Sequence, residues 1–168
     1  MKACLKTSWW KVPLYCIAAG WISFRLKVRI GAAFAISRLP DGTVSIDNTR
    51  WMVMSGVIFV VFLLLGGLLF RRMSRQEVFY SASVMVVFNV IGGLISYFFQ
   101  RTALGSSFAV FYSELHEWSG FVSQFVYDIG LNQWIGAVIV WAVPYLFVFF
   151  GKRLQDEKST WSNGADKA

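Results

Sequence analysis

Three basic residues stand at alternate positions in an otherwise apolar stretch of the N-terminal region: Arg25, Lys27 and Arg29. A charged side chain inside a membrane costs about 2.5–3.5 kcal/mol, so it usually pairs with another group or reaches water. Because a helix turns by about 100° per residue, Arg25 and Arg29 share a face and Lys27 points away from it. The cluster predicts an anion site or a partner contact. The alternative is that the side chains extend to lipid headgroups.

Acidic residues that could neutralise this cluster follow in the second half of the chain, with Glu114, Glu117 and Asp128 as the candidate partners. Opposite charges attract more strongly near a low-dielectric boundary than in water. We therefore expect one or more of these acids to pair with Arg25 or Arg29. Lipid phosphate groups are the alternative partners.

The Glu-Leu-His-Glu segment at 114–117 is the other concentration of titratable side chains. On a helix, Glu114 and Glu117 share a face, whereas His116 lies about 200° around from Glu114. The spacing also lacks the second His of a zinc-protease motif. We interpret this segment as a solvated polar face, and we expect no metal and no cofactor.

Catalytic motifs are absent from the sequence, which has one His, two Cys without metal-ligand spacing, and no phosphate-binding loop or nucleophile elbow. This absence argues against an enzyme. Asn89 stands at the centre of an uncharged segment, and its amide needs a hydrogen-bond partner if that segment lies in lipid. Asn89 therefore predicts a contact between membrane helices.

The elements that position these residues follow from composition. With 57% hydrophobic residues, 15% charged residues and a mean hydropathy of +0.56, the chain has more apolar surface than a soluble protein of this size could bury. Residues 51–70, 78–100 and 131–151 are uncharged segments, each long enough to cross a bilayer as a helix. A fourth crossing, at about 9–31, contains the basic cluster. A signal peptide and an interfacial helix are the alternatives for this segment.

The distribution of basic residues selects among the topologies. Four crossings with both termini in the cytoplasm place ten of the sixteen Lys and Arg residues inside and three outside. Three crossings put either the Arg71–Arg75 turn or the basic N-terminal region on the wrong side. The same rule accounts for the net charge of +7 without nucleic acid as a partner. We predict a multi-pass protein of a cell membrane, a bacterial plasma membrane in preference to a eukaryotic one.

Residues 106–129, between the third and fourth crossings, have the pattern of an amphipathic helix. Apolar residues alternate at spacings of three and four, which keeps them on one helical face. The stripe consists of Phe108, Phe111, Leu115, Trp118, Val122, Phe125 and Ile129. We expect this helix to lie on the outer membrane surface or to cap the bundle, with Ser119-Gly120 as the place where it would break. Because its polar face is not rich in Lys and Arg, packing on protein is favoured.

These predictions combine into one fold class and one leading function. The expected fold is an all-α integral membrane protein, with a four-helix transmembrane bundle within residues 1–153, an extracytoplasmic amphipathic helix, and a polar cytoplasmic tail at 154–168. Without catalytic groups, the best-supported function is a non-enzymatic accessory, regulatory or immunity-type subunit that acts by contact within the membrane. The alternative is a small oligomeric transporter or channel. The expected partners are the lipid bilayer and either another membrane protein or a second copy of the chain.

Overall fold

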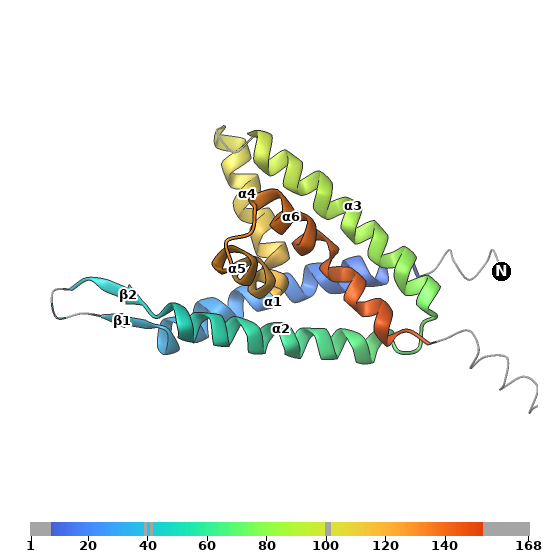
Figure 1. Cartoon of the computed structure of the whole chain (residues 1–168), viewed down its shortest axis with the longest axis horizontal. Coiled ribbons are helices and arrows are strands. Elements are labelled where there is room, and N and C mark those ends of the chain that lie inside the picture. The colour runs from blue at the N-terminus through green and yellow to red at the C-terminus, as the bar shows by residue number, and fades with distance from the viewer. Residues whose placement is uncertain (1–7, 39, 41, 100–101, 153–168) are drawn as a thin grey trace, which may run out of the picture.

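The computed structural model describes residues 8–38, 40, 42–99 and 102–152, which are mostly helical (Figure 1). The helices are α1 (Lys11–Phe34), α2 (Asn48–Phe70), α3 (Arg75–Phe99), α4 (Ala103–His116), α5 (Gly120–Asp128) and α6 (Gln133–Ala142), with the 3₁₀ helices η2 (Glu117–Ser119) and η3 (Val143–Phe150). The all-α class is confirmed. Among the described helices, α2 and α3 are long and apolar enough to cross a membrane.

The helix ends follow the local signals in the sequence. Ser74 and Glu77 form the reciprocal capping box that begins α3: the Ser74 N–H donates to the Glu77 carboxylate (3.0 Å), and the Glu77 N–H donates to the Ser74 hydroxyl (3.3 Å). The Asp47 side chain caps α2 by accepting from the Arg50 N–H (3.0 Å). These bonds satisfy N–H groups that have no partner within the helix, so both helices begin at defined residues.

A short antiparallel hairpin, which the hydropathy pattern does not predict, joins α1 to α2. Strand β1 (Ile36–Arg38) pairs with β2 (Val44–Ile46), with Ile36 opposite Ile46. Gly42 in the turn has φ +82°, a conformation that glycine adopts without strain. The hairpin projects from the end of the molecule opposite residues 8 and 152 (Figure 1). The Asp41-Gly42 pair is the sequence signal that could have identified it.

The segment expected as one amphipathic helix is two helices that fold back into the bundle. Helix α4 packs against α1 and α3, the chain turns at η2, and α5 packs against α2 and α6. Trp118, in η2, is 2% exposed and stacks on Phe59, at the midpoint of α2, and on Phe147 of η3. The tip of this α4–η2–α5 hairpin therefore lies beside the midpoint of α2, so the segment packs on protein, as favoured, but inside the bundle and neither on the membrane surface nor as a cap. The chain breaks the helix at 117–119, just before the expected point.

A close approach between α4 and α1 makes this insertion possible. A Cβ atom added to Gly20 would collide with the carbonyl group of Leu115, so only glycine allows the two backbones to meet here. Of the predicted apolar stripe, Leu115 and Trp118 are buried, whereas Phe111 is 57% exposed. The stripe is thus buried at the turn of the hairpin and exposed at Phe111, about one turn earlier in α4.

The last helical segment changes type at Pro144. Helix α6 gives way to the 3₁₀ helix η3 at Val143, and the chain then returns to the start of α3, where the Lys152 N–H donates to the Met73 carbonyl (2.9 Å) and the Arg75 N–H donates to the Lys152 carbonyl (3.1 Å). The buried apolar residues of α1, α2, α3, η2 and η3 form one core that includes Phe70, Met85, Trp118 and Phe147. This core holds the hairpin tip in place.

Candidate functional site

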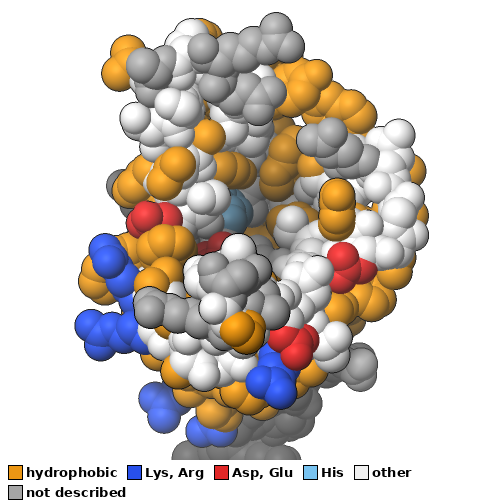
Figure 2. All heavy atoms as spheres, turned by 90° about the vertical axis from the view of Figure 1, so that its left-hand side faces the viewer, with side chains coloured by type: hydrophobic (Ala, Val, Ile, Leu, Met, Phe, Trp, Pro, Cys, Tyr) orange, Lys and Arg blue, Asp and Glu red, His pale blue; other side chains and the backbone are white. Residues whose placement is uncertain are grey.

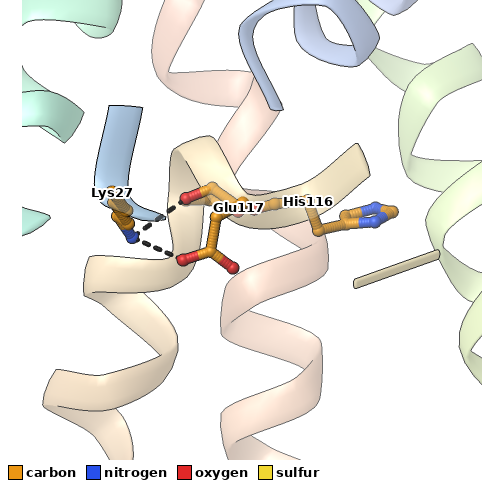
Figure 3. A network of polar contacts seen from close by, with 4 residues as sticks. Lys27, His116 and Glu117 are labelled. Atoms are coloured by element: carbon orange, nitrogen blue, oxygen red, sulfur yellow. Dashed lines mark hydrogen bonds and ion pairs between the residues drawn. The ribbon is translucent and has the colours of Figure 1, made fainter. Parts of the chain in front are cut away.

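A buried ion pair joins α1 to the tip of the α4–η2–α5 hairpin. The Lys27 ammonium lies 2.7 Å from Glu117 Oε1 and also donates to the Glu117 backbone carbonyl (3.2 Å), as Figure 3 shows. The Lys27 side chain is 4% exposed and the Glu117 side chain 27%. A lysine buried this deeply needs a paired and hydrogen-bonded partner. The contact supplies both and ties η2 to α1.

The surroundings of the ion pair leave room for little else. A Cβ atom on Gly120 would lie 3.0 Å from Lys27 Nζ and 3.0 Å from Glu117 Oε1, so a glycine at the start of α5 gives the pair its space. One turn before Lys27 on α1, the Ser23 hydroxyl is fully buried and has no hydrogen-bond partner among the described residues. The same holds for the buried Ser55 hydroxyl of α2. Buried hydroxyls without a partner are costly, which makes the inner faces of these helices polar without being fully bonded.

A second polar network lies on the other side of the tip. In Figure 3 the His116 ring points away from Glu117, toward α3. His116 Nε2 lies within hydrogen-bonding distance of Asn89 Oδ1, and His116 Nδ1 lies 2.9 Å from the Tyr112 carbonyl oxygen. The Tyr112 hydroxyl donates to the Asn89 carbonyl (2.6 Å). The Tyr112 carbonyl oxygen and Asn89 Oδ1 both only accept, so both His116 ring nitrogens donate in this arrangement.

Asn89 extends this network to the last helical segment. It is 1% exposed, and its amide donates to the Trp141 carbonyl (3.3 Å). In the 3₁₀ pattern that begins at Val143, this carbonyl would pair with the N–H of residue 144, and Pro144 has none. The Asn89 amide supplies the missing donor. One side chain on α3 therefore contacts both α4 and α6.

The charged candidates from the sequence separate in the structure. Lys27 and Glu117 meet, although the helical periodicity favoured Arg25 or Arg29 as the partner of an acid. Arg25 and Arg29 are exposed on the opposite face of α1, and the described structure gives neither an ion pair. Glu114 is half-buried, and Asp128 is exposed at the end of α5. The acids therefore do not neutralise the outward arginines.

We expected a solvated face at 114–117. This expectation is wrong for His116 and for the side of Glu117 that faces Lys27. The periodicity correctly separated the two glutamates from the histidine, but both directions lead into the protein, because α4 inserts between α1 and α3. Sequence reasoning missed this network. The available signals were the single His, the mid-helix Asn89, and the glycines at 20 and 92, which allow α4 to approach.

Two cavities open beside the hairpin. One, of about 230 Å³, lies between α3, α4 and α6 and is lined by residues that include Gly93, Ser96, Ala109 and Trp141. The other, of about 570 Å³, lies between α5 and α6 and shares Ala137 and Trp141 with the first. The side of the molecule seen from the β1–β2 hairpin is hollowed, and the pale-blue histidine side chain is visible inside the hollow (Figure 2).

The chemistry that this site can perform is binding and proton exchange. Within the described residues no three His, Cys, Asp or Glu side chains are grouped to hold a metal ion. At the hairpin tip, Glu117 bonds to Lys27 of α1 and His116 bonds to Asn89 of α3. Comparisons with protein-family models, with curated proteins and with solved structures find no match.

Proposed function

We propose that the chain is a multi-pass protein of a cell membrane, with four crossings and both termini in the cytoplasm. The crossings are α1, α2, α3 and the α6–η3 segment, and the α4–η2–α5 hairpin enters from the outer side. The apolar α2 and α3 support this proposal, as does the basic turn at Arg71, Arg72 and Arg75. On the buried face of α1 the only charged side chain is that of Lys27, and it is paired. This supports a crossing for α1 as well.

The orientation can be tested with reporter fusions to the full chain. Reporters placed after Pro40, after Arg75 and at the C-terminus should read outside, inside and inside. An outside reading at the C-terminus would contradict the topology, and an inside reading after Pro40 would remove α1 from the crossings. Each junction is therefore informative by itself.

We propose further that the protein acts without catalysis, as an accessory or regulatory subunit that contacts another membrane protein. The observation that carries this proposal is the contrast between the interior and the surface of the protein. The polar side chains at the hairpin tip bond to partners inside the protein, Lys27 and Asn89, whereas α2 and α5 present an apolar groove of about 520 Å³ to the exterior. The groove is lined by Met52, Val53, Gly56, Val57, Val60, Val61 and Phe121. A small residue in an apolar groove lets a partner helix approach closely.

Site-specific photo-crosslinking in the native membrane tests the contact. A photoreactive amino acid at Val57, in the groove, should give one adduct of defined mass with a protein partner, and the same probe at Tyr80, exposed on α3, should not. If both positions give only lipid adducts, the contact function is wrong. Adducts of the chain with itself at Val57 would identify the partner as a second copy.

A second candidate function, transport, is favoured by the position of His116 and Glu117. Ionisable side chains inside a membrane bundle commonly mark ion pathways, and here they lie at the tip of the α4–η2–α5 hairpin, beside a hollowed face (Figure 2). The full chain reconstituted with a pH-sensitive dye should then conduct protons in the wild type and not as His116→Gln. Equal dye response with and without protein would exclude proton transport.

A further inference from the structure

The outward face of α1 differs in character from its buried face. Arg25 and Arg29 are exposed one helical turn apart, and the exposed apolar side chains of Trp21, Ile22 and Leu26 lie around them. These five residues line a shallow groove of about 400 Å³ on the surface of α1. Two guanidinium groups beside an apolar groove form a surface for a molecule that is both anionic and apolar.

Within the described residues no acidic side chain neutralises these two cations. The ion pairs in the described structure are Lys27 with Glu117 and Arg50 with Asp47, so neither pair includes Arg25 or Arg29. The Arg25 guanidinium instead lies over the ring of Trp21, 5.5 Å from its centroid, and 6.0 Å from that of Phe24. This cation–π contact holds Arg25 against the helix without cancelling its charge.

The depth of the pair on α1 identifies the ligand chemistry. Arg25 follows Lys11, where α1 begins, by a rise of about 21 Å at about 1.5 Å per residue. In the proposed topology this places both arginines near the outer end of the hydrocarbon core, within reach of lipid phosphate groups. Guanidinium groups bind phosphate oxygens through paired hydrogen bonds. An apolar helix face without arginines could not bind a phosphate group in this way.

We propose that Arg25 and Arg29 form a binding site for an anionic phospholipid of the outer leaflet, with the phosphate on the two guanidinium groups and an acyl chain along Trp21 and Ile22. The inference rests on the proposed crossing of α1. The phosphate approaches from the membrane side, opposite the Lys27–Glu117 pair, so lipid binding and the internal ion pair use separate faces of one helix.

The experiment measures lipid retention by the full chain purified in mild detergent. Native mass spectrometry with added phosphatidylglycerol should show binding to the wild type at least about tenfold tighter than to Arg25→Gln/Arg29→Gln, as expected for loss of two charge-assisted contacts. Phosphatidylcholine should not show this difference. Inorganic phosphate should not compete at millimolar concentration if the acyl chain contributes to binding.

A matched control separates a local site from general charge attraction. Arg71→Gln/Arg72→Gln removes the same two charges at the other end of the bundle, where both side chains are exposed, and should retain tight phosphatidylglycerol binding. Equal loss in the two double variants would overturn the site, as would equal binding of both lipids. The reporter after Pro40 gives an independent check: an outside reading with no lipid preference rejects this inference and leaves the topology intact.

Discussion

The two faces of α1 both carry positive charge, but the charge is buried and paired on one face and exposed on the other. On the inner face, Lys27 is buried against Glu117 and shares its stripe with Gly20 and Ser23. On the outer face, Arg25 and Arg29 are exposed and have no acidic partner in the described structure. The residues alternate along the chain, but the helix places them about 200° apart at each step. One basic cluster in the sequence is therefore two sites in space.

The difference between the faces shows what each charge can contribute. A buried pair is costly to break, because removal of one partner leaves the other charge desolvated and unpaired. An exposed arginine contributes little to folding, and its charge remains available to bind an outside molecule. The inner face thus fixes the position of the hairpin tip, and the outer face is free to bind. The predictions below test this division, from the largest expected effect to the smallest.

Lys27→Met should be the most damaging substitution on α1. It leaves the partly buried Glu117 without its cation and should lower the free energy of unfolding by about 3 kcal/mol, the lower end of the range for a broken buried pair. Thermal or detergent denaturation of the purified chain measures this. Lys27→Met/Glu117→Leu should recover most of the loss, since apolar residues can replace a buried pair. A double variant as unstable as Lys27→Met would contradict the pairing.

Gly20→Ala should be the next largest change, because it separates two backbones. The added methyl group meets the Leu115 carbonyl, and neither backbone can move without shifting α4 against α1. Overpacking of this kind costs about 1–3 kcal/mol. Gly56→Ala is the matched control: its methyl group meets only the Phe121 ring, at 3.2 Å, and should cost less. Equal melting temperatures for the two variants would contradict the claim that the close approach of α1 and α4 contributes to stability.

Asn89→Leu should have a smaller effect, although Asn89 contacts two helices. The substitution removes the donor to the Trp141 carbonyl and the partner of His116. Hydrogen bonds of this kind between membrane helices contribute about 0.6 kcal/mol on average and about 1.7 kcal/mol at most, so a loss of about 1 kcal/mol is expected. Asn89→Leu/His116→Phe should be no worse than Asn89→Leu if the two side chains form one network. An additive loss in the denaturation experiment would show that they act separately.

Much of the fold could be predicted from the sequence because its signals are local. Uncharged segments located α2 and α3, and the capping box located the turn between them, since these features depend on neighbouring residues. The α4–η2–α5 hairpin could not be placed this way. Its apolar stripe is compatible with a surface helix, and its insertion depends on Gly20 of a distant helix, a tertiary contact that no periodicity encodes.

The candidate site could be predicted in its residues but not in its pairing. Lys27, Glu117 and Asn89 are recognisable because each is polar and needs a partner in an apolar environment. Which acid meets which base depends on the face that α1 turns inward. That choice is made by the small residues Ala19, Gly20 and Ser23, which share the buried stripe with Lys27 and leave space for α4 and η2. A count of charges along the sequence cannot distinguish Lys27 from Arg25 and Arg29.

Arg25→Glu gives the smallest expected change in stability and the sharpest test of the two faces. If Arg25 were paired with an acid of the protein, reversal of its charge would create repulsion and destabilise the fold. In the described structure it has no such acid, and a glutamate at 25 would lie one turn from Arg29, a spacing that stabilises helices by about 0.2–0.5 kcal/mol. The free energy of unfolding in detergent without lipid should therefore change by less than about 0.5 kcal/mol, as for most surface substitutions. Added phosphatidylglycerol should then stabilise the wild type and not the variant, because the lipid phosphate would meet a carboxylate. A large loss of stability in lipid-free detergent would instead assign Arg25 a partner within the protein.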